Sequence, residues 1–454
     1  MADLSGADLL DGPRGRRLVL EFLQVALGRV FAAHSDGSGE PLDRIGRELK
    51  ELFSTVGEAS YALDPGAGST VVRYSTREPR DWGLFGPGSG LLYSMLPAEA
   101  LSPDPDDDPD PQRSAAAAGA ALGRALRLLG EFAPAATAGM LDEAWGIAIN
   151  NARYWQEPDG DDLLAENPRV AACLRRVAGL LVDSGALHGW EAVCDPGEQF
   201  AVDWIEDEDT AEAGTGAGTD SAAGTGSEAL AKSELNPQPA TAILLDWWSQ
   251  TVDAEQRDRK HFKRDPGAMA GGEWWSCPPR NLTTTSGPYP LAPGPSELYL
   301  VEDSFDPETA RVTACLPPVG SAMRIHEIHT PEDWVVLVRR FPLDVSASRR
   351  NVWYLATGRD VRWLIPDWQQ VAEHYDAVHV SLAGYLRTAG RALPVGGMGW
   401  LPGDKRIGHG NEATVMAGWN PDETFWLHDL PQRMGRTVTW RWCDEPDPGH
   451  WVRD

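Results

Sequence analysis

The chain has 454 residues, a formal net charge of −28 and five cysteines. Its length predicts two domains that can each bury a core, and its acidity excludes non-specific binding to duplex nucleic acid, whose phosphates an acidic surface repels. The widely spaced cysteines lack CxxC motifs and no run of about 18 apolar residues occurs, so we expect reduced thiols, no zinc site, no membrane span and a cytoplasmic location.

Residues 1–206 predict a mainly helical, acidic domain. Apolar residues recur at helical spacing over 13–31, 42–62, 114–132, 140–155 and 168–184. Residues 70–75 alternate like a short strand, whereas proline and aspartate dominate 101–111 and predict a solvated loop. The first 240 residues hold 40 acidic and 18 basic residues, so we expect this part to be the one that could dock a basic protein partner.

Residues 207–240 predict a flexible linker. This stretch is rich in Gly, Ala and Thr and contains neither an aromatic residue nor an apolar period. We therefore expect the two halves to move independently unless their surfaces dock.

Residues 241–454 predict a tryptophan-rich α+β domain, which makes the whole chain α+β in class. A helix is expected over 240–262, and short strands over 273–276, 297–301, 310–316 and 323–328. Further helices are expected over 331–340 and 366–375, followed by a strand over 377–382. Fourteen of the 19 tryptophans lie in this half, where core packing is their commonest role and stacking on a planar ligand the alternative.

The strand over 377–382 carries the first candidate site. Val378 and Val380 alternate with His379 and Ser381, so the His and the Ser share one face of the strand. At a spacing of about 7 Å both could address one substrate, but His379 could not activate Ser381 directly. A histidine satisfied on a half-exposed sheet is the structural alternative.

The second candidate is the stretch 324–329. Thr330, Pro331 and Asp333 after it fit an N-terminal helix cap, which leaves Arg324, His326, Glu327 and His329 for chemistry. Residues three apart on a strand face opposite ways, so His326 and His329 should not converge on a metal ion.

Basic residues between 339 and 362 form a third candidate. Arg349, Arg350 and Arg359 belong to this group, and arginine suits a phosphate or carboxylate. A solvated charge run or internal salt bridges are the commoner explanation of such a group. We add Trp363 and Tyr385 as further ligand-binding candidates. No Walker motif occurs, and no GxGxxG follows a strand.

Two stretches resemble actinobacterial proteins of unassigned function: residues 151–160, and residues 368–386 together with 418–427. The back half also resembles the ADP-ribosyltransferase class, which implies NAD as cofactor. In that class a basic or His residue on an early strand, a hydroxyl-bearing strand and a late glutamate handle NAD. The matching positions are Arg324 or His326, then His379 and Ser381, then Glu423.

Two functional hypotheses follow, with a toxin or toxin-like effector as a remaining alternative. In the first, the back half is an enzyme that binds or acts on a nucleotide-like or other anionic small molecule, such as an NAD-using transferase or hydrolase, with His379 or Glu423 as base. In the second, the chain is a non-enzymatic interaction or regulatory protein, with an acidic docking half and an aromatic binding half.

Overall fold

The computed structural model describes residues 4–34, 44–64, 111–132, 138–205, 238–268, 272–304, 307–318, 322–396, 412–443 and 449–454. Helices and mixed sheets together give an α+β fold, as predicted. Among these residues no helix has the length and apolar character needed to cross a membrane. The strand predicted over 70–75 and the loop over 101–110 lie outside the described residues.

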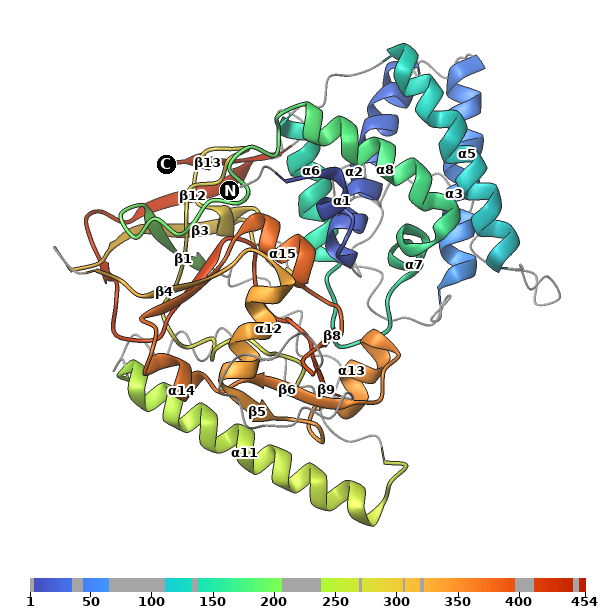
Figure 1. Cartoon of the computed structure of the whole chain (residues 1–454). Helices are drawn as coiled ribbons and strands as arrows, with labels where there is room; N and C mark the ends of the chain where they lie inside the picture. Colours follow the sequence, from blue (N-terminus) through green and yellow to red (C-terminus); the bar gives the residue numbers. More distant parts are fainter. Residues whose placement is uncertain are drawn as a thin grey trace.

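The first half of the chain forms a group of helices (Figure 1). They are α1 (Gly6–Leu9), α2 (Pro13–His34), α3 (Arg44–Leu63), α5 (Pro111–Phe132), α6 (Ala138–Asn150), α7 (Gly160–Glu166) and α8 (Pro168–Asp183). Helix α2 contacts α3, α6 and α7 and is buried almost all round. Its polar stripe is buried too, since Arg17 pairs with Glu21 and with Asp159. Helix α6 ends at Asn150 rather than near residue 155.

A large sheet forms the centre of the second group of elements. Its strand order is β13-β12-β3-β1-β2-β10-β7-β4, with β11 beside β3. The strands are β1 (Gln199–Ile205), β2 (Thr284–Ser286), β3 (Thr309–Leu316), β4 (Ile325–Ile328), β7 (Ala377–Val380), β10 (Glu423–Trp426), β11 (Gln432–Arg433), β12 (Val438–Cys443) and β13 (His450–Arg453). The described pairings in it are antiparallel except that of β4 with β7, which is parallel.

A second, smaller sheet has the order β5-β6-β9-β8. Its strands are β5 (Pro342–Asp344), β6 (Arg362–Pro366), β8 (Leu393–Pro394) and β9 (Glu412–Thr414). Helix α12 (Pro331–Arg340) contacts both β4 and β6 and so joins the two sheets, as Figure 1 shows. Its predicted bounds are confirmed, and Thr330 and Asp333 form the expected capping box before Pro331.

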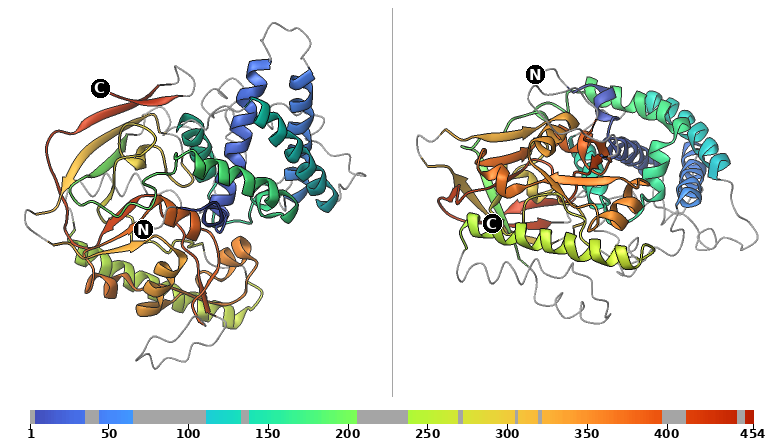
Figure 2. Two further views of the ribbon diagram at one scale, coloured as in Figure 1. Left: turned by 45° about the horizontal axis from the view of Figure 1, so that its top comes forward. Right: turned by 60° about the horizontal axis from the view of Figure 1, so that its bottom comes forward.

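The remaining helices surround these sheets. They are α11 (Ala240–Arg264), the 3₁₀ turn η3 (Ser296–Leu298), α13 (Arg350–Thr357), α14 (Trp368–Ala372) and α15 (Leu382–Thr388). Both views of Figure 2 show α11 away from the helices of the first half. The strands predicted over 273–276 and 297–301 are wrong: the first is irregular and the second contains η3. The helix predicted over 366–375 is only α14, because Pro366 closes β6.

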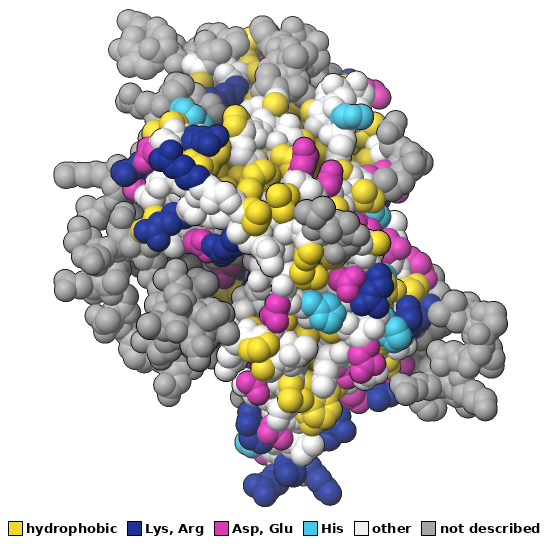
Figure 3. All heavy atoms as spheres, turned by 90° about the vertical axis from the view of Figure 1, so that its left-hand side faces the viewer, with side chains coloured by type: hydrophobic (Ala, Val, Ile, Leu, Met, Phe, Trp, Pro, Cys, Tyr) yellow, Lys and Arg dark blue, Asp and Glu magenta, His cyan; other side chains and the backbone are white. Residues whose placement is uncertain are grey.

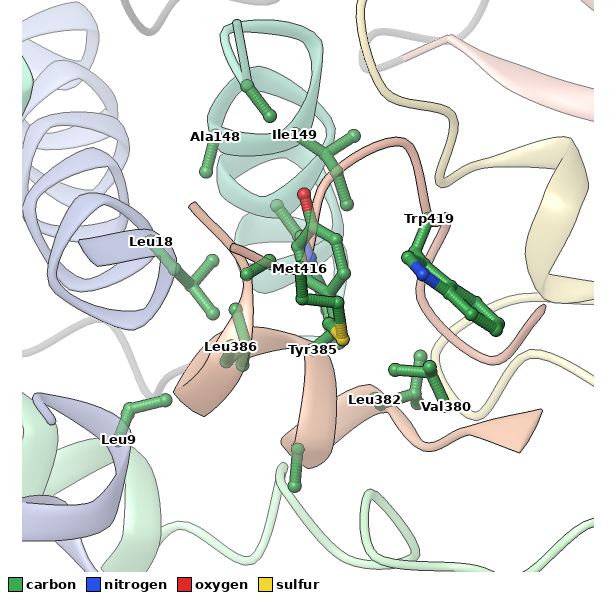
Figure 4. Packing of buried hydrophobic residues seen from close by; sticks show 14 of the residues in the cluster. Leu9, Leu18, Ala148, Ile149, Val380, Leu382, Tyr385, Leu386, Met416 and Trp419 are labelled. Atoms are coloured by element: carbon green, nitrogen blue, oxygen red, sulfur yellow. The ribbon is translucent and has the colours of Figure 1, made fainter. Parts of the chain in front are cut away.

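One apolar core runs through both groups of elements. Figure 4 shows Leu18 of α2 close to Leu386 of α15, and these two helices are in contact. A Cβ atom on Gly12, at the start of α2, would overlap the carbonyl oxygen of Leu386, so the two helices touch through their backbones. Strand β1, which precedes residues 207–240, pairs with β3, which follows them. The boundaries of the predicted domains and linker stay a prediction.

Tryptophan packs mainly into this core. Among the described residues, the fully buried tryptophans are Trp145, Trp190, Trp334, Trp353, Trp363, Trp368, Trp419 and Trp426. Trp334, Trp368 and Trp419 form edge-to-face or tilted contacts with ring centroids 6.0–6.2 Å apart. Trp440 and Trp451 are also buried, so core packing accounts for eight of the 14 tryptophans of the back half.

The surface mixes charges of both signs with apolar side chains. On the face drawn in Figure 3, the described basic side chains lie among acidic and hydrophobic ones and do not merge into one broad patch. The acidic side chains are likewise scattered over this face.

Candidate functional site

The parallel pairing of β4 with β7 brings two of the predicted candidates together. Glu327 lies opposite His379, and Ile328 opposite Val380. His329 and Ser381 are therefore the first residues beyond the carboxyl ends of two adjacent parallel strands.

Ser381 and His329 are in hydrogen-bond contact there. Ser381 Oγ lies 3.0 Å from His329 Nδ1 and accepts a hydrogen bond from the backbone N–H of Gly384, which makes Ser381 the N-cap of α15. Gly384 permits this fit, because a Cβ there would overlap the carbonyl oxygen of Ile328. Ser381 is buried, so it holds the ring of His329 from the protein side.

His379 lies between two carboxylates. Its Nδ1 is 2.6 Å from Glu327 Oε2 and its Nε2 is 3.1 Å from Asp422 Oδ1. Burial disfavours the imidazolium, but the hydrogen bonds to Asp422 and Glu327 outweigh burial and raise the pKa of His379 to about 9. A histidine that is protonated at neutral pH and has both nitrogens bonded cannot serve as the predicted base.

Asp422 is held in a tight turn before β10. Its φ of 62° lies in the left-handed region, where a non-glycine residue is strained. Its Oδ2 accepts hydrogen bonds from Gly287 N at 3.0 Å and Ser296 Oγ at 2.7 Å, while Oδ1 faces His379. These contacts fix the carboxylate beside His379.

Glu327 connects His379 to His329. Its Oε1 accepts a hydrogen bond from Cys194 N at 3.1 Å, and its Oε2 lies 3.8 Å from His329 Nε2. Burial opposes ionisation of Glu327, but the hydrogen bond and charge of His379 outweigh it, so the pKa of Glu327 is lowered. Burial lowers the pKa of His329, which is therefore mainly neutral at pH 7.

The segment between α8 and β1 covers this part of the sheet. The thiol of Cys194 contacts Thr424 Oγ1 at 3.6 Å, and Ala383 N donates to Trp190 O at 2.9 Å. Burial raises the pKa of Cys194 to about 12, so this thiol is not a nucleophile at neutral pH. Glu327 and His329 still reach solvent, with 22% and 17% of their side chains exposed.

Glu423, the third predicted catalytic residue, has other partners. Its Oε1 accepts a hydrogen bond from Arg280 at 2.6 Å, and its Oε2 accepts one from Asn420 N at 2.8 Å. Strand residues alternate in direction, and Thr424, not Glu423, lies opposite His379. Glu423 is therefore not brought together with His379 and Ser381.

Three of the four arginines predicted to bind a ligand have interaction partners within the protein. Arg324 pairs with Asp376 at 2.7 Å, Arg349 pairs with Glu273 at 2.7 Å, and Arg350 lies over the ring of Phe262. Arg359 is exposed on the chain beyond α13. These positions give internal ion pairs and packing rather than one anion site.

The other predicted ligand residues are also apart from the site. His326 Nε2 lies 3.2 Å from Asp333 O, Trp363 is in the core, and Tyr385 hydrogen-bonds Glu302 at 2.5 Å. His326 and His329 bond different partners, Asp333 O and Ser381 Oγ. Among the described residues no group of three or more His, Cys, Asp or Glu side chains is placed to hold a metal ion.

Sequence reasoning missed Asp422 and the contact of His329 with Ser381. Asp422 stood beside the chosen Glu423, and its turn position after Pro421 was the available signal. Comparison with protein-family models, curated proteins and solved structures finds no match for this chain.

Proposed function

We propose that the protein is an enzyme that hydrolyses a small molecule at the carboxyl ends of β4 and β7, with His329 as general base. The observation that carries this proposal is the 3.0 Å contact of His329 Nδ1 with the buried Ser381 Oγ, which fixes a partly exposed imidazole at that edge. A neutral imidazole is the side chain best suited to proton transfer near pH 7.

The hydrogen bonds around Ser381 support this assignment. A hydroxyl has two acceptor sites, and Ser381 Oγ can accept from both Gly384 N and a proton on His329 Nδ1. The other ring nitrogen, Nε2, then carries the lone pair that a base needs. Nε2 is on the side of the ring that faces Glu327, and the Glu327 side chain has access to solvent.

The reaction then has two proton transfers. His329 Nε2 takes a proton from water as the water oxygen bonds to the electrophilic carbon of the substrate. The bond to the leaving group breaks, and the protonated His329 returns the proton to it. Glu327 stabilises the transient charge on His329, since its carboxylate lies 3.8 Å from Nε2.

That the substrate is NAD or another anion stays a prediction. The arginines expected to bind anions have partners of their own, and carboxylates border His329. Neither the local charge nor the buried Trp363 supports a nucleotide-like substrate. The interaction-protein hypothesis has no observation in its favour that the enzyme proposal lacks.

The test is hydrolysis of a panel of chromogenic esters and amides by the full chain. We expect kcat/KM to rise with pH through the pKa of His329 and then level, and His329→Gln to lower it at least about 100-fold. Ser381→Ala should lower kcat and alter the pH profile, because it frees the ring of His329.

His326→Gln is the matched control, since His326 lies on β4 three residues before His329 but bonds the carbonyl of Asp333. It should retain the activity of the unaltered chain. Absence of hydrolysis across the panel, or activity that survives His329→Gln, would refute the proposal.

A further inference from the structure

We infer that His379 is a positioning residue of the proposed reaction, which holds the carboxylate of Glu327 away from His329 Nε2 and so keeps that nitrogen available as the base. This inference rests on the proposed function and adds to it a role for a charged side chain that the reaction itself does not use. It follows from one oxygen atom of Glu327 that lies between the two histidines.

Glu327 Oε2 faces two imidazole rings but is bonded to one of them. It lies 2.6 Å from His379 Nδ1 and 3.8 Å from His329 Nε2, and the second distance is too long for a hydrogen bond. The other oxygen, Oε1, accepts a hydrogen bond from Cys194 N at 3.1 Å. The carboxylate is therefore oriented by His379 and Cys194 rather than by His329.

His379 is well suited to hold this carboxylate. Both of its ring nitrogens lie within hydrogen-bond distance of a carboxylate, Glu327 or Asp422, and an ionised carboxylate only accepts, so each nitrogen carries a proton. Hydrogen bonds assisted by charge in this way are about twice as strong as neutral ones. The His379 side chain is 1% exposed, and its strand is paired with β4 on one side and β10 on the other. The sheet thus keeps the imidazolium in place.

Without this contact, Glu327 would be drawn to His329. Only 3.8 Å separates the carboxylate from Nε2, so a small rotation of the Glu327 side chain would close the gap. A carboxylate that accepts a hydrogen bond from Nε2 selects the tautomer with the proton on that nitrogen. The lone pair would then lie on Nδ1, which faces the buried Ser381 rather than a substrate. The contact of Glu327 with His379 therefore preserves the tautomer that the reaction needs.

The charges that face His329 set the direction of the expected pH effect. Burial and the charge of His379 disfavour the protonated ring, and its pKa is lowered. Three carboxylates act in the opposite direction: Glu327, Asp333 and Glu191. Arg387 donates to His329 O at 3.1 Å, but its charge is paired with Glu191 at 2.8 Å. Loss of the His379 charge, with Glu327 able to turn toward Nε2, should therefore raise the pKa of His329.

The test combines the pH profile of ester hydrolysis by the full chain with nitrogen NMR of the same protein labelled in its histidines. His379→Gln should move the inflection of kcat/KM upward by at least about half a pH unit, because a carboxylate in contact favours the imidazolium of His329. The proton of neutral His329 should lie on Nδ1 in the unaltered chain and on Nε2 in this variant. His428→Gln is the matched control, since His428 bonds the carbonyl of Ala372, and both readouts should stay unchanged in it.

His329-dependent hydrolysis with the same inflection in His379→Gln as in the unaltered chain would overturn the inference and leave the enzyme proposal standing. Should His379→Gln fail to fold, the unaltered chain still decides, because a proton on Nε2 of neutral His329 would overturn the inference. Absence of hydrolysis would overturn the enzyme proposal. In that case, the move of the His329 proton from Nδ1 to Nε2 in His379→Gln would still support the hold of His379 on Glu327, and the same tautomer in both chains would overturn it too.

Discussion

The hydroxyl oxygens of Tyr154 and Tyr385 lie 3.0 Å apart, and Tyr385 donates to Glu302 at 2.5 Å. This contact joins the segment after α6 to helix α15, whose N-cap holds His329. All three side chains are buried, so their hydrogen bonds lack competition from water.

Tyr385→Phe should destabilise the protein by ~1–3 kcal/mol, because it removes the donor to a buried carboxyl group and the partner of Tyr154. Urea unfolding monitored by fluorescence and circular dichroism measures the change. Tyr354→Phe is the control at an exposed tyrosine, and its effect should stay within ~0.5 kcal/mol. Equal effects of the two substitutions would contradict a specific role for the buried pair.

Stability should fall as pH rises from about 5 to 9. Burial raises the pKa of Glu21 to about 7 and those of Glu297 and Glu302 to about 8, while the flanking carboxylates raise that of His379 to about 9. The folded protein therefore holds these protons more tightly than the unfolded chain. This stabilisation is complete below the pKa values that the groups have in the unfolded chain. It is lost as pH rises through the pKa values that they have in the folded protein.

Unfolding free energies measured at pH 5.5, 7 and 9, at constant ionic strength, check this fall of stability with pH. His379→Gln should make the unfolding free energy depend less on pH between 6.5, the pKa of histidine in the unfolded chain, and about 9, the pKa of His379 in the fold. His450→Gln, at an exposed position, should not have this effect. A profile that rises toward pH 9 would be incompatible with these raised pKa values.

Gly384→Ala should cost ~1–3 kcal/mol, because the new Cβ would force α15 away from the carbonyl oxygen of Ile328. Gly146→Ala is a matched change within helix α6, where a Cβ meets nothing within 4 Å. It should stabilise the protein by ~0.5–1 kcal/mol. Thermal unfolding of both variants distinguishes close packing from a general glycine effect, and a neutral Gly384→Ala would disprove the packing argument.

Residues 241–454 expressed alone should lack a fixed tertiary structure. The fragment loses β1, which pairs with β2 and β3, and the α2 residues that cover α15. Poor dispersion in amide NMR spectra and binding of a hydrophobic dye would show this. A full chain cleaved at a protease site inserted between residues 207 and 237 is the control, and its two pieces should stay associated.

Local signals in the sequence were sufficient for some elements. Helix α12 and its cap could be predicted because Thr330, Pro331 and Asp333 are neighbours in the chain, and β3 could be predicted as a short run between Pro/Gly-rich turns. By contrast, the residues 273–276 contain two tryptophans that favour a strand, yet tertiary contacts hold them in an irregular segment.

The site itself depends on strand pairing that local patterns do not encode. His379 and Ser381 were chosen from alternation, and Glu327 and His329 from their spacing, but nothing in either stretch fixed the register that places them side by side. The partners of the arginines are likewise distant in sequence, as Arg349 and Glu273 illustrate. The cluster of arginines in the sequence therefore predicted an anion-binding surface, whereas in the folded protein such residues form internal ion pairs.

The contact between Tyr154 and Tyr385 spans 231 residues and so also bears on biosynthesis. At about 5–20 residues per second, the ribosome needs roughly 10–50 s to add α15 after it has made Tyr154. During that time the early helices lack the surface that covers them, and their apolar residues are open to chaperones and proteases. Chains that terminate before α15 should accordingly be degraded rather than accumulate as a stable helical half.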